Sequence, residues 1–383
     1  MASFVGSLTG LGGGVVLVPV YTLVLGVPIQ YAAGASLVST KATSLGTSVA
    51  YVRDKITNVR IGMSLEVATS LGALTGSLAV ALIFSLGLQR LVYVVFGAVL
   101  LLSSYTQMKV LTTARRARPP PDRWTKRLRL YGRYYGALEG REVEYYGVRW
   151  WLGALVMFSA GVVSGFLGIS GASKVLAMDW AMALPIKVSA ATSNFTIGVT
   201  AATSSAVYWT HGYIQPFLAS ATALGVLLGA FAGSRILPRL KSRSVGLIFT
   251  AINHPGSPDD FERGMELEDL VVLVMRAGLV ASVALLIGGV SMTLLGPAGV
   301  ADVHSPVNSS AYPLSRLLHT LPSAPSAVAV MFMGLAALLA TPLIRMALAV
   351  LEFAKEGDWV YLGLTFFVLL ILLISLFLLS IRV

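Results

Sequence analysis

The stretch PIQYAAGAS, from Pro28 to Ser36, is repeated as PIKVSAATS, from Pro185 to Ser193, at an offset of 157 residues. The same register aligns other residues of the two halves: Gly14 with Gly171, Tyr51 with Tyr208, Gly72 with Gly229, Gly76 with Gly233, and Ser77 with Ser234. Glycine is common in this chain, so one Gly–Gly match carries little weight. A shared Pro and a shared Gly-x-x-x-Gly-Ser in one register indicate a genuine internal repeat.

The amino-acid composition indicates whether this repeat lies in water or in a membrane. Hydrophobic residues make up 56% of the chain, charged residues 12%, and the mean hydropathy is +0.80. Soluble domains carry roughly 25% charged residues, and the apolar runs here are long enough to cross a bilayer as helices. Because these runs are continuous and do not alternate, they disfavour a β-barrel. The composition predicts an all-α polytopic membrane protein.

The net charge of +11 is concentrated in one part of the chain. Ten Lys and Arg residues lie between Thr112 and Arg149, in a loop between apolar blocks. This is the pattern that keeps a loop cytoplasmic, so we expect a multi-pass plasma-membrane protein and no nucleic-acid partner. The chain has no Cys, which excludes disulfides and thiolate metal sites. We expect no metal and no cofactor.

Charge and length together suggest how the chain is organised. We expect a first repeat over 1–111, a basic cytoplasmic linker over 112–149, a second repeat over 150–253 and a C-terminal three-helix membrane module over 254–383. The segment from Val245 to Ile252 is too short to span the membrane as a helix. Its role as the last element of the second repeat is therefore left open.

The positive-inside rule predicts the orientation of the repeats. Basic residues place both ends of the stretch from Trp150 to Leu184 on the cytoplasmic side, so this stretch should be a re-entrant or broken-helix hairpin turning near Gly168. The equivalent hairpin of the first repeat turns at Gly10 to Gly14 and should lie on the outer side. Each repeat is then one hairpin plus about three transmembrane helices. An odd number of crossings gives the two copies inverted topology, which is typical of secondary transporters with a binding site between the halves.

The two hairpin tips are the first candidates for this site. Gly12, Gly13 and Gly14 form one tip, and Ser170 and Gly171 lie at the other. The half-helix after each tip should point its free N–H groups and its positive dipole end at the membrane centre, where they attract anions. The alternative is that these glycines only permit close packing. We prefer that alternative for Gly72-x-x-x-Gly76 and for Gly229-x-x-x-Gly233.

Ionisable residues within apolar blocks supply the second set of candidates. Lys41 lies near the middle of its block among hydroxyl residues, and Lys174 lies one helical turn past the second tip. Ser36, Ser193 and Asn194 could donate hydrogen bonds to a small anionic substrate, or bridge helices. The alternative for Lys174 is that it snorkels or pairs with Asp179.

Three more charged residues are expected near a membrane surface or on the inner side. We expect Glu66 to be a solvated or interfacial carboxylate, Arg276 to snorkel, and Arg345 to fall on the inner side of the membrane.

The same residues carry a family likeness. The pattern Gly-x-Gly-Gly-Gly-x-x-x-x-Pro from Gly10 to Pro19, the Gly26-Val-Pro28 and Ala33-Gly-Ala-Ser36 stretches, and the second copy from Gly165 to Ser193 resemble the sulfite exporter TauE/SafE family. The resemblance covers roughly residues 1–252. It implies a carrier, usually an exporter, for small sulfur-containing or carboxylated anions such as sulfite, thiosulfate or sulfonates, with proton coupling as one option. The region from Glu268 to Val383 is similar to a small three-helix membrane family of unknown function.

Other readings of the sequence stay open. A passive anion channel would use the same inverted repeats and the same dipoles. The Gly168-Ile-Ser170-Gly171 motif is shared with rhomboid intramembrane proteases, but none of the four histidines lies in a predicted span. We therefore predict a transporter and not an enzyme, in contact with the lipid bilayer. The chain could also form a homo-oligomer.

Overall fold

The fold is almost entirely helical. The computed structural model describes residues 2–9, 13–112, 119–136, 141–169, 174–175, 177–236, 267–295, 309, 312 and 326–378. Within these ranges, 6 helices are long and apolar enough to cross a membrane. This confirms the predicted all-α polytopic membrane protein.

The first repeat and the linker contain the following elements. They are α1 (Ala2–Thr9), α2 (Gly14–Pro19), the π-helix η1 (Val20–Val24), α3 (Ile29–Arg53), α4 (Val59–Ser85), α5 (Gln89–Thr112), α6 (Arg123–Arg127), β1 (Tyr131–Gly136) and β2 (Arg141–Tyr146). The linker is thus more than the loop that was expected. Its strands form an antiparallel hairpin in which Tyr131 pairs with Tyr146.

The second repeat and the C-terminal module follow. Their elements are α7 (Trp150–Leu167), the π-helix η2 (Ala177–Ala181), α9 (Ile186–Thr210), α10 (Pro216–Ile236), α12 (Leu267–Leu295), α14 (Ser326–Lys355), α15 (Trp359–Leu373) and the π-helix η7 (Ile374–Leu378). The α14 helix continues through Arg345 to Lys355. The segment from Val245 to Ile252 lies outside the described residues.

The internal repeat recurs in the backbone at the same offset. Helices α3 and α9 both have 25 residues, and each starts after a Pro in the same extended conformation, with φ −54° at Pro28 and −59° at Pro185. The π-helices η1 and η2 coincide in register, and positive φ recurs at Gly26 and at its equivalent Ala183. The sequence repeat is therefore a structural repeat.

The stretch from Trp150 to Leu184 returns to its starting point. Gly168 ends α7 in the left-handed conformation, with φ 70°. The amide of Val148 then donates to the carbonyl of Met182 at 3.1 Å, so the two ends of the stretch lie side by side. This confirms the predicted hairpin, with α7 as its first arm.

Each hairpin packs on the other repeat through small residues. A Cβ atom added to Gly72 or Gly76 of α4 would collide with backbone carbonyls of α7, at Phe158 and Val162. The equivalent Gly229 of α10 lies against Phe4 of α1, where an added Cβ would be 3.0 Å from the amide nitrogen. The matched Gly-x-x-x-Gly pairs are thus packing positions, as predicted, and they join the two repeats reciprocally.

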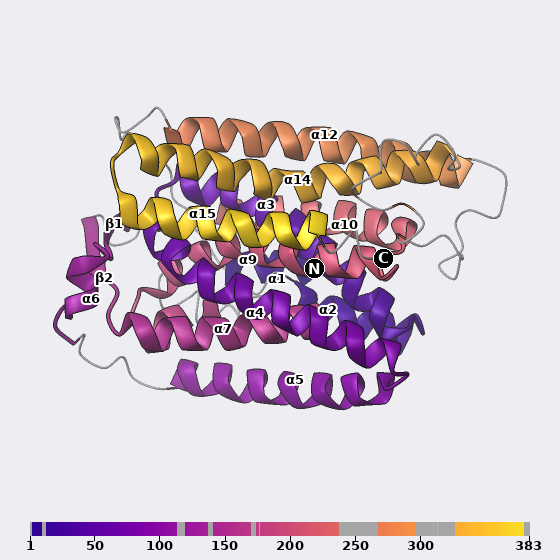
Figure 1. The fold of residues 1–383 in the computed structure, drawn as a ribbon, viewed down its shortest axis with the longest axis horizontal. Helices are drawn as coiled ribbons and strands as arrows, with labels where there is room; N and C mark the ends of the chain where they lie inside the picture. Colours follow the sequence, from indigo (N-terminus) through magenta and orange to yellow (C-terminus); the bar gives the residue numbers. More distant parts are fainter. Residues whose placement is uncertain are drawn as a thin grey trace.

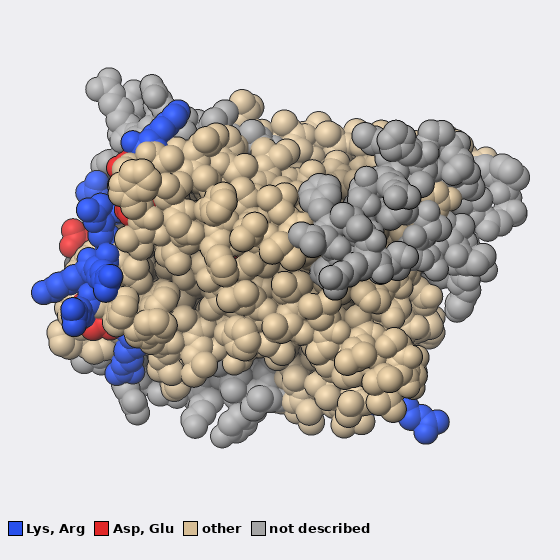
Figure 2. All heavy atoms as spheres, in the orientation of Figure 1, with Lys and Arg blue, Asp and Glu red and all other residues tan. Residues whose placement is uncertain are grey.

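The helices lie side by side, and the charged residues gather at one end of the molecule. Figure 1 shows α12, α14 and α15 as a layer over α3, α9 and α10, while α5 lies apart at the opposite edge. Figure 2 shows a broad uncharged face, with Lys, Arg, Asp and Glu concentrated at the end that carries α6, β1 and β2. The broad face is the one that lipid would cover, and the linker forms one polar end.

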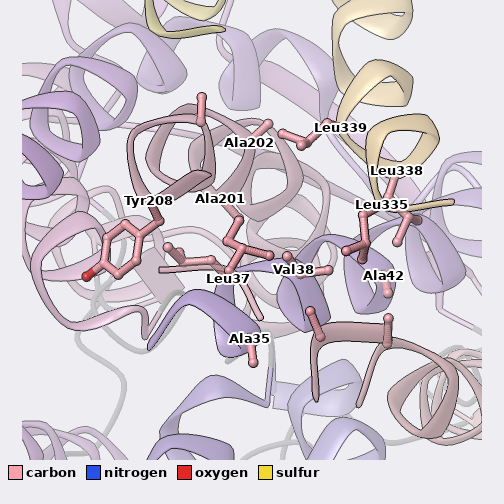
Figure 3. Packing of buried hydrophobic residues seen from close by; sticks show 14 of the residues in the cluster. Ala35, Leu37, Val38, Ala42, Ala201, Ala202, Tyr208, Leu335, Leu338 and Leu339 are labelled. Atoms are coloured by element: carbon pink, nitrogen blue, oxygen red, sulfur yellow. The ribbon is translucent and has the colours of Figure 1, made fainter. Parts of the chain in front are cut away.

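The C-terminal module packs directly on both repeats. Figure 3 shows Leu335 and Leu338 of α14 beside Val38 and Ala42 of α3, and Leu339 beside Ala202 of α9. All these residues belong to one buried apolar cluster. The module therefore shares the hydrophobic core of the transporter repeats.

Candidate functional site

The two hairpin tips meet inside the molecule. The Ser36 hydroxyl of α3 donates to the carbonyl of Gly168, at the second tip, at 2.7 Å. A Cβ atom on Gly14, at the first tip, would lie 2.6 Å from Ser36 Oγ and 3.1 Å from the same Gly168 oxygen. Gly13 has φ 78°, which lets the chain turn into α2. The structure thus brings together Gly13, Gly14 and Ser36, whereas Gly12, Ser170 and Gly171 lie outside the described residues.

Lys41 is buried near the middle of α3 without a counter-charge in contact. Its exposed fraction is 0%, and its Nζ has no hydrogen-bond partner among the described residues. The neighbouring hydroxyls of Ser39 and Thr40 already donate to carbonyls one turn earlier, at 2.7 Å each. A buried ammonium costs several kcal/mol unless it is paired. An anionic ligand bound beside Nζ would therefore stabilise the charged form of Lys41.

Asn194 joins the first hairpin to the second repeat. Its Nδ2 donates to the carbonyl of Ser7 at 2.7 Å, and its own backbone carbonyl accepts from Ser44 Oγ at 2.6 Å. Ser193 is buried beside it. Of the two roles that the sequence left open, the Nδ2 group bridges helices, whereas Oδ1 has no partner among the described residues.

Lys174 and Glu66 are connected through Thr200. Lys174 Nζ hydrogen-bonds to Thr200 Oγ1, and Thr200 Oγ1 donates to Glu66 Oε1 at 2.8 Å. The Ser70 hydroxyl donates to the same carboxylate oxygen at 3.2 Å. The hydrogen bond that orients Lys174 is thus to Thr200 of α9, which the sequence did not single out.

The interpretation of Glu66 as an interfacial carboxylate is wrong. Only 1% of Glu66 is exposed, because helices of both repeats surround it, and its Oε2 has no partner among the described residues. The acidic residue lies only seven positions after the start of α4, at Val59, which made it look superficial. The linker hairpin and the module cover that end of α4, through hydrogen bonds from Asn58 to Tyr131 and Tyr145 and through the ion pair of Arg60 with Glu356.

Arg345 lies within α14 and is buried, which the sequence did not predict. Arg345 is 2% exposed, its Nη2 donates to the carbonyl of Phe195 at 3.0 Å, and its guanidinium carbon lies 4.1 Å from the centre of the Phe195 ring. Its Nε has no partner among the described residues. Arg345 and Lys174 both interact electrostatically with Glu66. By contrast, Arg276 is exposed on α12, consistent with a snorkelling residue.

A cavity of about 360 Å³ opens at the charged end. Its lining comes from the α3–α4 turn, the linker hairpin, α9 and α14. It includes Lys55, Arg60, Arg133, Tyr145, Phe195, Arg345, Glu352 and Glu356. Burial raises the pKa of Tyr145 to about 12, so its hydroxyl stays neutral. The cavity thus reaches from surface charges to the buried Arg345.

Sequence comparisons agree with this architecture. The profile of the family described as sulfite exporter TauE/SafE matches residues 1–253, and that of a family of unknown function, DUF1634, matches residues 271–377. The probable membrane transporter protein YunE of Bacillus subtilis (strain 168) is 28% identical over 260 residues, which cover 66% of this chain and 90% of that relative. No solved structure matches the chain.

Proposed function

Because this chain belongs to the sulfite exporter TauE/SafE family and is a membrane transporter, we propose that it moves small sulfur-containing or carboxylated anions by secondary active transport. Sulfite, thiosulfate and sulfonates are the proposed substrates, and export is the proposed direction. The proposed location is the plasma membrane, with the basic linker cytoplasmic. Figure 2 supports this orientation, since the linker lies at the charged end.

The burial of Lys41 is the observation that supports the proposal most directly. A fully buried ammonium with no partner among the described residues is expensive unless a ligand compensates its charge. It lies five residues beyond Ser36, whose hydroxyl contacts the second hairpin tip. An anion held there would receive charge from Lys41 and N–H dipoles from the tips.

We assign the remaining candidates in the same way. Lys174 supplies a second positive charge beside Thr200. The tip residues Gly12, Gly13, Gly14, Ser170 and Gly171 supply backbone N–H groups, and Ser36, Ser193 and Asn194 line the approach. For proton coupling, Glu66 is the proposed carrier, since it is a buried carboxylate within hydrogen-bond reach of that lysine's partner Thr200.

Flux measurements in proteoliposomes test the function. Purified wild-type protein should give saturable sulfite flux, Lys41→Ala should reduce the rate at least about tenfold, and Lys41→Arg should retain part of it. Equal rates for wild type and Lys41→Ala would refute the assignment of Lys41. Thermal stability of each variant in detergent is the control for folding.

The same vesicles separate a carrier from a channel. A carrier gives saturable flux that responds to an imposed pH gradient, and Glu66→Gln should abolish this response. A channel gives currents that follow the electrochemical gradient of the anion and do not saturate in the same range. Currents of that kind would show that the protein is a passive channel and would refute secondary transport.

A further inference from the structure

The C-terminal module of unknown function contributes charged side chains to the centre of the protein. Arg345 of α14 donates to the carbonyl of Phe195 in α9 and stacks on the ring of that residue. Phe195 directly follows Asn194, which binds the first hairpin through Ser7. The module thus contacts the region where the two repeats meet, and not only their lipid-facing surface.

The buried charges around Arg345 do not balance. Glu66 is one carboxylate that interacts electrostatically with two cations, Lys174 and Arg345. With all three groups charged, this cluster carries a net charge of +1 inside the molecule. Glu66 Oε2 and Arg345 Nε both lack partners within the described part of the chain. Burial of uncompensated positive charge is costly, so the cluster favours a bound anion.

The cavity offers such an anion a route to Arg345. Four basic side chains line it, namely Lys55, Arg60, Arg133 and Arg345, against two acidic ones, Glu352 and Glu356. Arg60 Nη2 binds Glu356 at 3.1 Å and Arg133 Nη1 binds Glu142 at 3.3 Å, so these two pairs are neutral and the excess positive charge comes from Lys55 and Arg345. Basic walls around a confined space raise the local concentration of anions. The volume of about 360 Å³ is large enough for a small oxyanion with its water.

We propose that this cavity is the cytoplasmic access site for the substrate anion and that Arg345 of the module is a substrate-contacting residue at its inner end. A planar guanidinium suits this task because it binds oxyanions through two parallel N–H groups. The module is then part of the transport path. This inference rests on the proposed function, and it adds a site and a partner domain to it.

Sulfite flux and sulfite binding test the inference. In proteoliposomes, Arg345→Gln should raise the KM for sulfite at least about tenfold, and Arg345→Lys should raise it less, since charge is kept and the fork is lost. The exposed Arg276→Gln, in the same module, is the matched control and should leave the KM unchanged. In a thermal-shift titration with sulfite, Arg345→Gln should bind more weakly than Arg345→Lys, and Arg276→Gln should bind like the wild type.

A second variant, at an exposed residue of the cavity, tests the inference even if substitution of the buried Arg345 causes misfolding. Arg133 is 69% exposed in its side chain, so Arg133→Glu should fold normally. It should raise the KM for sulfite at low salt, and the effect should shrink at high salt. If Arg345→Gln and Arg133→Glu both keep the wild-type KM while Lys41→Ala loses flux, the access site is refuted and the proposed function stands. If the wild type carries no sulfite, thiosulfate or sulfonate, both are refuted.

Discussion

Lys41, Lys174 and Arg345 place positive charge inside the helix bundle, and Glu66 offers a carboxylate to two of them. An apolar residue of similar size at any of these positions would give a more stable folded protein. Sites that sacrifice stability in this way are typical of function. We therefore interpret the charges at these four positions as parts of the proposed anion site.

Glu66→Gln should lower the free energy of unfolding by about 3 kcal/mol or more. The substitution can keep hydrogen bonds to Thr200 and Ser70 but leaves Lys174 and Arg345 without their counter-charge. Chemical or thermal denaturation in detergent measures the change. Glu356→Gln, which breaks a partly exposed pair with Arg60, is the control and should change stability by at most about 1 kcal/mol.

The double variant Glu66→Gln/Lys174→Met shows whether the effect is electrostatic. Removing the nearby cation should restore a large part of the lost stability, because the two sites are coupled through Thr200. Strictly additive losses would mean that Glu66 acts only through shape.

Part of this candidate site was predictable from the sequence. An ionisable residue in an apolar block is a strong signal, and it found Lys41 and Lys174. It missed Glu66 and Arg345, because each lies near the end of an apolar block. Glu66 is buried against Thr200 and Arg345 against Phe195, both on α9, and no local pattern predicts such contacts between distant helices. An alternative signal was available for Arg345, since apolar residues continue beyond it to Leu351.

At the scale of elements, the hairpin of each repeat packs against glycines in a helix of the other repeat. Gly76→Ala should destabilise the protein by about 2 kcal/mol or more, because the added methyl would collide with the carbonyl of Val162 in α7. Gly225→Ala in α10 is the matched control. An added Cβ there meets nothing within 4 Å, so helix propensity should make this variant neutral or slightly more stable. Equal effects at both sites would contradict the packing assignment.

The linker has its own pH dependence, which depends on Asp122. Burial alone would raise the pKa of Asp122, but bonds from the Thr125 and Arg149 amides, both 2.7 Å long, and from the Thr125 hydroxyl lower it. A depressed folded pKa stabilises the linker above the ordinary value of about 4, and this stabilisation is lost as the pH falls through the depressed value.

Tryptophan fluorescence reports this transition, because Trp124 of α6 stacks on Trp150 with 5.8 Å between ring centres. Acidification below about pH 4 should change the emission of the wild type. In Asp122→Asn, the acid-induced change should be missing. A wild-type signal that stays constant to pH 2 would contradict the role of Asp122.

Helices marked by the sequence repeat were predictable, whereas strands that form only by pairing with each other were not. The 157-residue offset indicated equivalent helices, and α3 and α9 follow it from first to last residue. The hairpin β1–β2 was missed because its Tyr-rich strands, Tyr131–Gly136 and Arg141–Tyr146, look like a polar loop until they pair. The π-helices η1 and η2 carry no sequence signal of their own, although the repeat places them in register.

At the scale of the whole molecule, the orientation of the two ends can be tested with single cysteines, since the chain has none. Lys55→Cys and Arg133→Cys line the same cavity and should both be protected from a membrane-impermeant maleimide added to intact cells. Leu88→Cys, in the turn between α4 and α5, is the control and should be labelled. Labelling of only one of the first two would contradict their shared side.

The central claim is that buried cations between two inverted halves hold a small anion. Selenite, the selenium analogue of sulfite, makes this visible by anomalous X-ray scattering from crystals of the full chain. We predict a selenium peak within hydrogen-bond distance of Lys41 Nζ, near the meeting point of Gly14, Ser36 and Gly168. Selenium peaks confined to the exposed basic residues of the linker, with none in the bundle, would contradict the claim.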